Sequence, residues 1–135
     1  MNLKISGSKT IAELQKDFQQ AFPYLKIEVF KHSHAKGQPS RKEDMIPEST
    51  PLSSLINDKE IELALSPDMT TASAEKLFKE QAGLNVQIFR RSGDVWIETS
   101  RTDDWSLAFQ NEEGRKSTLP VEEEQADLGD RDKWE

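Results

Sequence analysis

The sequence predicts an α+β fold, and three observations lead to it. Two segments share one pattern, "LKISGSKTIAELQKDFQQAFPYLKIEVFK" from Leu3 and "LALSPDMTTASAEKLFKEQAGLNVQIFR" from Leu63. Each reads as a strand, a helix and a strand, and a hairpin pattern follows the second. The repeat predicts a duplicated βαβ unit in a two-layer, ferredoxin-like βαββαβ sandwich, to which the hairpin adds a C-terminal strand and a short helix. Right-handed crossovers would place both main helices on one face of a single antiparallel sheet.

Each expected helix begins at a threonine. Thr10 starts the first helix, and Glu13 completes a capping box with it, whereas Thr70 starts the second. Pro23 ends the first helix, and Gly83 stands where the second needs a left-handed residue. Apolar side chains at helical spacing then give each helix one core-facing side. They are Ile11, Leu14, Phe18, Ala21 and Phe22 in the first, and Ala74, Leu77, Phe78 and Ala82 in the second.

The strand after each helix alternates apolar and polar side chains, over 25–30 and 84–89. A slip of one residue would expose the whole apolar set, so the side that faces the core is well determined. Ser92 and Gly93 are expected to form the tight turn of the hairpin. That turn would pair Phe89 directly with Trp96, with both aromatic rings on the side away from the helices.

The remaining segments are connections and a short helix. Residues 33–59 form a long connection, of a length that is uncommon in compact domains unless it is functional or mobile. Within it, "TPLSSLIN" predicts one helical turn. "TDDWSLAFQNEEG" predicts a short helix that Asp103 or Asp104 caps and Gly114 ends. Its Trp105 and Phe109 could fold back over the hairpin aromatics.

Composition limits the classes of function. The 135 residues suit one domain, expected over 1–114, followed by an acidic, flexible tail over 115–135. The net charge of -7 disfavours general binding to nucleic-acid phosphates. The absence of cysteine excludes disulfides, zinc–thiolate sites and thiol nucleophiles, and fits a reducing compartment. With no signal peptide or membrane-spanning run in the sequence, we expect a cytoplasmic protein.

The second half of the chain resembles a known group. The run "AGLNVQIFRRSGDVWIETS", followed by "TDDWSLAFQNEEG", is similar to a family of small uncharacterised bacterial proteins known mainly as structural-genomics targets. The resemblance covers roughly the second half. It implies a bacterial origin and brings no assigned activity, cofactor or catalytic residue.

Two candidate ligand sites follow from the long connection. His32 and His34 could begin a metal site, but no third ligand on the connection is aimed at them by regular spacing, so we expect no metal and no cofactor. A basic stretch could receive a small anion, a nucleotide or an acidic partner, or could fold toward the acidic tail. It lacks the Gly-Lys-Ser/Thr of a phosphate-binding loop. Its members are Lys31, His32, His34, Lys36, Arg41 and Lys42.

Catalysis and nucleic-acid binding are not expected. The sequence has no Gly-x-Ser-x-Gly nucleophile elbow. Arginines flank Trp96, but the central strands of the expected sheet carry no stacking aromatic and no RNA-binding signature.

The sequence therefore predicts a small non-catalytic interaction module, monomeric or weakly dimeric. It would bind a protein partner through the open sheet face or an edge strand. The alternatives are a small-anion or nucleotide sensor that uses loop 31–42 and an enzyme with a site that the sequence does not reveal. The expected contact residues are Phe30, His32, His34, Lys36, Arg41, Lys42, Phe89, Arg91 and Trp96.

Overall fold

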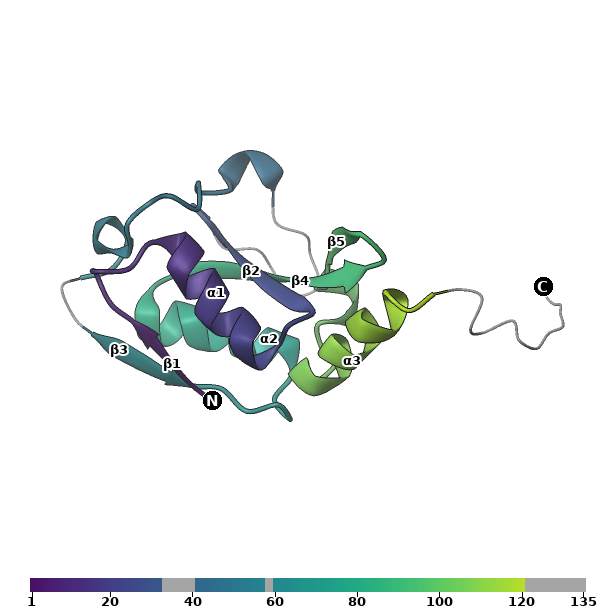
Figure 1. Ribbon diagram of the computed structural model, residues 1–135. Helices are drawn as coiled ribbons and strands as arrows, with labels where there is room; N and C mark the ends of the chain where they lie inside the picture. The colour runs from purple at the N-terminus through teal and green to yellow at the C-terminus, as the bar shows by residue number, and fades with distance from the viewer. Residues whose placement is uncertain (33–40, 58–59, 121–135) are drawn as a thin grey trace, which may run out of the picture.

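The computed structural model describes residues 1–32, 41–57 and 60–120, and confirms the α+β class (Figure 1). Two antiparallel sheets and three α-helices make up these residues. The main elements are β1 (Asn2–Ile5), α1 (Ile11–Ala21), β2 (Leu25–Phe30), β3 (Ile61–Ala64), α2 (Thr71–Leu77), β4 (Asn85–Ser92), β5 (Val95–Glu98) and α3 (Leu107–Ser117). The short 3-10 turns are η1 (Lys42–Asp44), η2 (Leu52–Ser54) and η4 (Ser100–Thr102), and η3 (Phe78–Ala82) continues α2 as a π-helix.

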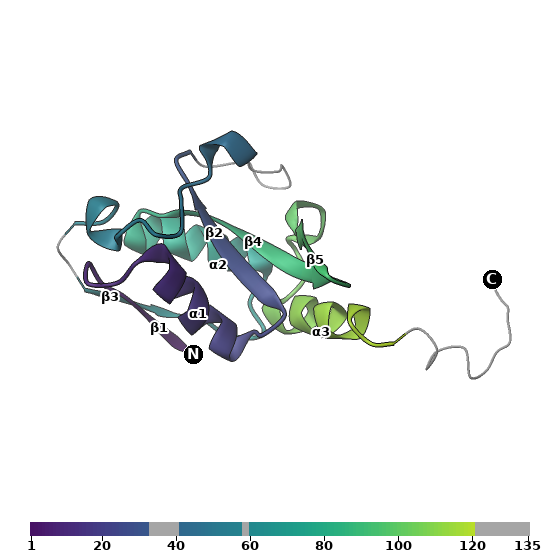
Figure 2. The same ribbon diagram turned by 45° about the horizontal axis from the view of Figure 1, so that its top comes forward.

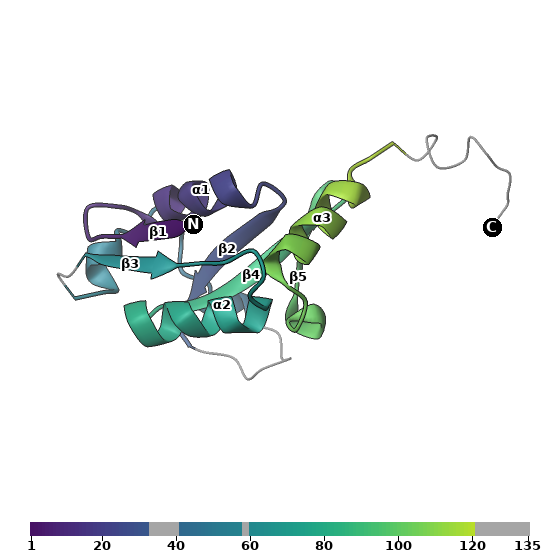
Figure 3. The ribbon, with the colours of Figure 1, turned by 90° about the horizontal axis from the view of Figure 1, so that it is seen from below.

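The strands form two sheets, β1–β3 and β2–β4–β5. Leu3 lies opposite Leu63 in the first sheet, and Glu28 lies opposite Gln87 in the second. Seen from below, β1 and β3 lie between α1 and α2, with β2 and β4 running behind them (Figure 3). Two sheets and a helix on each flank therefore enclose the core, which includes the fully buried Phe18 of α1 and Phe78 at the end of α2.

This pairing corrects the expected ferredoxin-like arrangement. In that fold all four strands share one sheet, and β2 and β4 lie at its opposite edges. Here β2 and β4 are direct neighbours along their length, and β5 extends the same sheet (Figure 2). Alternation in a sequence determines which side of a strand is buried, but it does not determine which strand lies beside it.

The helix starts confirm the expected caps. The Thr10 N–H donates to Oε1 of Glu13 at 2.8 Å, and the Glu13 N–H donates to Oγ1 of Thr10 at 3.3 Å. In the second half Ser73 replaces the glutamate. Its N–H donates to Oγ1 of Thr70 at 3.1 Å, and the two hydroxyl groups bond to each other at 2.8 Å. The N-terminus of each helix is therefore capped, and two hydrogen bonds that involve side chains form the cap in each case.

A distant segment binds the start of each helix in the same way. The bridges are Thr10–Pro51 and Thr70–Ser106. Next to them, the Leu52 N–H donates to the carbonyl of Lys9 at 2.8 Å, and the Leu107 N–H donates to that of Met69 at 3.0 Å. Both leucine side chains are fully buried. Leu52 and Leu107 thus hold corresponding places in the two halves, and Leu52 begins η2, the helical turn expected in "TPLSSLIN".

A further segment lies along the outer edge of each long strand. The Ile46 N–H donates to the carbonyl of Val29 at 2.8 Å, on β2. The Thr99 N–H donates to the carbonyl of Ile88 at 3.3 Å, on β4, immediately after β5. Residues 44–46 therefore accompany β2 as β5 accompanies β4.

The hairpin register differs from the expected one. Gly93 has a φ of 63°, and it forms the turn with Asp94, so that Ser92 lies opposite Val95. Trp96 then lies opposite Arg91, whereas the sequence predicted Phe89 as its partner. The glycine takes the first turn position because a positive φ costs it nothing there.

Helix α3 also differs at both ends from the expectation. Ser106 caps it, accepting from the Phe109 N–H at 3.0 Å, and the helix continues through Gly114 to Ser117. At Gly114 a Cβ would come within 2.9 Å of the Tyr24 Cβ. Gly114 therefore allows α3 to lie close to Tyr24, the residue before β2. From the sequence alone, this glycine was interpreted as the end of the helix.

The far end of α3 is attached to the hairpin. The Ser117 hydroxyl accepts from the Gly93 N–H at 3.0 Å, and its single hydrogen lies within reach of two carbonyls, that of Gly114 at 2.7 Å and that of Arg91 at 3.0 Å. One side chain thus links the end of α3 to the hairpin tip.

Candidate functional site

The Trp96 ring lies between two cations. The Arg91 guanidinium carbon is 5.2 Å from the ring centroid, and the Lys26 ammonium nitrogen is 5.6 Å from it. Trp96 remains partly exposed. Cations at this distance from an aromatic face are attracted by its negative quadrupole, so they hold the ring in one orientation.

Strand register places these groups on one side of the hairpin sheet. Arg91 is opposite Trp96, and Phe89 lies two residues before Arg91 on the same side. Phe89 is also the cross-strand neighbour of Lys26. We call the side chains of Lys26, Phe89, Arg91 and Trp96 the Trp96 face. All four are partly exposed.

Helix α3 covers the other side of the hairpin. Arg90, whose side chain alternates away from Arg91, donates to Oε1 of Gln110 at 3.0 Å and lies over the Trp105 ring at 5.3 Å. Trp105 packs edge-on against Phe109 at 4.8 Å between ring centroids. This aromatic pair is therefore associated with the Arg90 side and does not cover Trp96.

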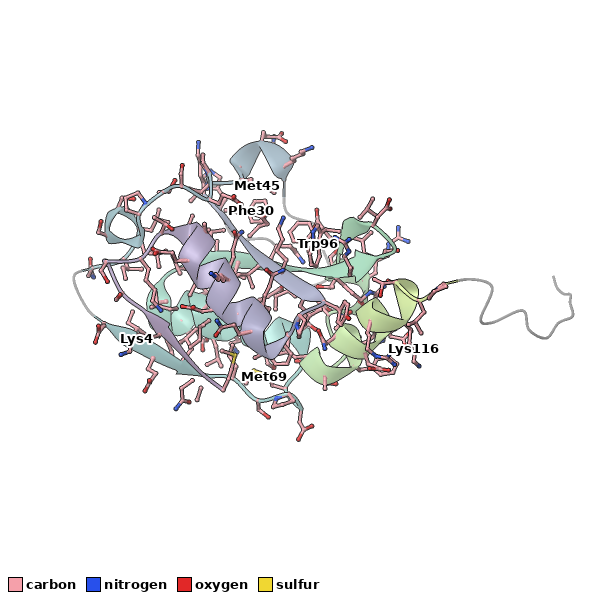
Figure 4. All side chains as sticks on the ribbon, in the orientation of Figure 1. Lys4, Phe30, Met45, Met69, Trp96 and Lys116 are labelled. Carbon is pink, nitrogen blue, oxygen red and sulfur yellow. The ribbon has the colours of Figure 1, made fainter. Side chains whose placement is uncertain are left out.

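The expected contact residues are separated by the fold. Phe30 is only 3% exposed and bridges to Met45, so its ring has little surface to offer a partner (Figure 4). His32 is exposed just before the long connection, and Arg41 and Lys42 are exposed within it, where Arg41 pairs with Glu43 at 2.7 Å. His34 and Lys36 lie outside the described residues. Phe89, Arg91 and Trp96 are the expected residues that the fold brings together.

A cavity lies beside Phe30, at the end of β2. It has a volume of about 320 Å³, and its lining includes Ile46, Leu55 and Leu84 as well as Lys31. The cavity therefore lies between the end of β2, η2 and the start of β4. The Lys31 N–H donates to the carbonyl of Asp44 at 2.8 Å, which fixes the backbone at its rim.

A buried carboxyl group lies between α2 and β4. Glu75 is 8% exposed, and its Oε2 accepts from the Ile88 N–H at 2.9 Å and from the Gln87 amide at 3.3 Å. Burial raises the pKa of Glu75 to about 8, because its charged form loses hydration. The Ile88 N–H opposes this rise in pKa, and the carboxylates of Asp103 and Glu98 add to it.

The first half contains the corresponding contact with the chemical groups exchanged. Gln15 holds the place of Glu75, and its amide donates to the carbonyl of Ile27 at 2.7 Å and to Oε1 of Glu28 at 3.2 Å. Glu28 in turn lies opposite Gln87 across the sheet. Each half thus uses one amide and one carboxyl group to connect its helix to the central pair of strands.

Sequence reasoning did not identify Lys26, Glu75 or the cavity. Lys26 joins the Trp96 face only because β2 pairs with β4, which the sequence did not predict. Gln15 and Glu75 occupy helix positions that face the core, four residues after Ile11 and Thr71. A polar residue at a core-facing position in both copies of the repeat was the available signal.

Comparison with known proteins finds no relative of this chain. No protein-family model, curated protein or solved structure matches this chain. Within residues 1–32, 41–57 and 60–120, no group of three or more metal-ligating side chains is placed to hold a metal ion. In the same residues no helix has the length and apolar character that crossing a membrane requires.

Proposed function

We propose that this protein is a non-catalytic interaction module that binds a protein partner through the Trp96 face. The observation that carries the proposal is the partly exposed Trp96 ring held between Lys26 and Arg91, on the side of the hairpin opposite α3. Tryptophan and arginine are the residues most enriched among those that dominate binding energy at protein interfaces. A ring that is already ordered loses little entropy when a partner covers it.

The edge of β5 extends the proposed contact surface. Ser92 pairs with Val95, and the Thr99 N–H bonds to the carbonyl of Ile88, so alternate residues of β5 direct their backbone groups toward β4. The N–H and carbonyl of Trp96 therefore point to the open edge. An extended segment of a partner can add there as a further strand and cover the Trp96 ring.

The matching contacts of the two halves support an origin by duplication of one βαβ unit. The helix caps, the bridges at the helix starts and the segments that accompany β2 and β4 all recur. A cytoplasmic location and a bacterial origin belong to the same proposal, on the basis of the sequence.

The test uses a photo-crosslinking amino acid in the full chain. It is placed at Val95, which is 54% exposed and adjacent to Trp96, and in a control protein at Lys4 on the outer side of β1 (Figure 4). A partner that crosslinks at Val95 and not at Lys4 is purified, and its affinity is measured by calorimetry. We expect Trp96→Ala to weaken binding by about 30-fold or more, equivalent to roughly 2 kcal/mol.

Phe109→Ala is the matched control, because this ring is aromatic and 47% exposed on α3. It should change the affinity less than about twofold, within the range of residues outside a hot spot. Equal crosslinking at both positions, or equal binding by Trp96→Ala and the parent protein, would exclude the Trp96 face as the contact surface.

A further inference from the structure

The cavity beside Phe30 exists because the two halves differ at corresponding places. Leu52 and Leu107 make the same backbone contact at the starts of η2 and α3. Helix α3 then continues to Ser117, whereas η2 ends at Ser54. Among the described residues, the first half therefore has no helix at the place that α3 fills in the second half.

Contacts of α3 show what fills that place in the second half. Its Gly114 packs against Tyr24 and Arg90, and its Gln110 accepts from the Arg90 guanidinium at 3.0 Å. Asn111 accepts from the Tyr24 N–H at 2.8 Å. The end of β4 is thus covered by a helix that supplies both packing and hydrogen-bond acceptors.

Lys31 corresponds to Arg90 in the repeat and has a different environment. Within the described part of the chain, the Lys31 ammonium group has neither an acceptor nor an ion-pair partner. Lys31 is an exposed residue and is part of the lining of the cavity. Ile46 and Leu55, which are partly exposed, contribute apolar lining, and Ser54 and Asn85 contribute polar groups. The lining of the cavity therefore combines apolar and polar groups with one cation, Lys31.

We propose that this cavity binds a small monocarboxylate with an apolar body. The carboxylate accepts hydrogen bonds from the Lys31 ammonium group, and the apolar body displaces water from the partly exposed Ile46 and Leu55. A volume of about 320 Å³ lies at the lower end of the range for small-molecule sites, roughly 300–1,000 Å³. The acid thus supplies Lys31 with a hydrogen-bond acceptor and with packing, as α3 does for Arg90. The site lies away from the Trp96 face and does not depend on partner binding there.

Benzoate titrated into the full chain is the first test. We expect saturable shifts of the methyl NMR signals of Ile46, Leu55 and Leu84. Benzyl alcohol, which keeps the ring and lacks the charge, should bind about tenfold more weakly because it loses a charge-assisted bond. Absence of saturable shifts with benzoate, or equal binding of the alcohol and the acid, would overturn the proposal.

Three variants locate the site. Lys31→Gln should weaken benzoate binding by about tenfold, for the same loss of a charged contact. Ser54→Trp should abolish binding, because Ser54 is exposed and lines the cavity, so a large ring there fills it. Lys42→Gln is the control, since it removes an exposed charge on the nearby η1. Dispersed spectra establish that each variant is folded.

The outcomes separate this inference from the proposed partner. Trp96→Ala should leave benzoate binding unchanged. Unaltered binding by Lys31→Gln, or a crosslinker at Ser54 that captures a helical segment of another protein in place of a small acid, would show that the cavity has a different occupant.

Discussion

Replacement of Glu75 by glutamine should make the protein more stable, and increasingly so as the pH rises. The buried carboxyl group accepts two hydrogen bonds and lies near Asp103 and Glu98. The glutamine oxygen can accept the same two bonds without acquiring charge. The first half of the chain already has glutamine, Gln15, at the corresponding helix position.

The magnitude follows from the difference in pKa. The ordinary value is 4.5 and the folded value is about 8, a difference of 3.5 pH units. Between these pH values the folded protein binds a proton at Glu75 that the unfolded chain has released. The favourable contribution is complete below pH 4.5 and is lost as the pH rises toward 8.

Each pH unit corresponds to about 1.4 kcal/mol, so the full difference sets an upper limit of about 5 kcal/mol. Local relaxation and water entry reduce the penalty of a buried charge. We therefore expect Glu75→Gln to exceed the parent protein in free energy of unfolding by about 2–4 kcal/mol at pH 8 and by less than about 1 kcal/mol at pH 4.5.

Urea unfolding between pH 4.5 and 8.5, at constant ionic strength, measures this difference. Circular dichroism and tryptophan fluorescence should give the same midpoints, as a two-state transition requires. Glu80→Gln is the control, because it removes the same charge from an exposed site at the end of the same helical segment. A difference between Glu75→Gln and the parent that does not change with pH would refute the raised pKa. A less stable Glu75→Gln at pH 8 would show that the carboxylate form is the one that the fold favours.

Three further substitutions test the packing. Gly114→Ala should destabilise the protein by about 1–3 kcal/mol in thermal unfolding, because the new Cβ meets Tyr24 at 2.9 Å. This cost exceeds the gain from the higher helix propensity of alanine. A stabilised variant would contradict the close approach. Thr10→Ala removes half of the capping box and should cost about 1 kcal/mol in urea, whereas an unchanged midpoint would count against the cap. Leu52→Ala and Leu107→Ala should each cost about 2–5 kcal/mol by the same assay, since both side chains are fully buried; a small effect for one alone would show that the two places are not equivalent.

Local structure could be predicted from the sequence because local interactions determine it. The Thr10 cap, the alternation of β2 and β4 and the turn at Leu52 depend on residues close together in the chain. The pairing of β2 with β4 could not be predicted, because an apolar strand face is buried equally well in one sheet or in two facing sheets. The hairpin turn lay one residue further along the chain for a similar reason, since Ser92-Gly93 and Gly93-Asp94 are both suitable turn pairs, and this moves the partner of Trp96 by two residues, from Phe89 to Arg91.

The candidate site could be predicted only in part. Trp96 and Arg91 were expected contact residues, and their alternation along the hairpin was enough to identify them. Lys26 and the cavity depend on contacts between distant segments. Glu75 was overlooked because a glutamate on a helix is usually at the surface, and only the neighbouring β4 makes its position buried.

The Ser117 hydroxyl links the hairpin tip to the end of α3, and this has a mechanical consequence. A load applied to the chain just beyond α3 reaches the hairpin tip in part through the hydrogen bond that the Gly93 N–H donates to the Ser117 hydroxyl. A surface, a bead or a fusion attached after residue 120 would therefore pull on the Trp96 face. Immobilisation from the other end, ahead of β1, would leave the hairpin without that tension.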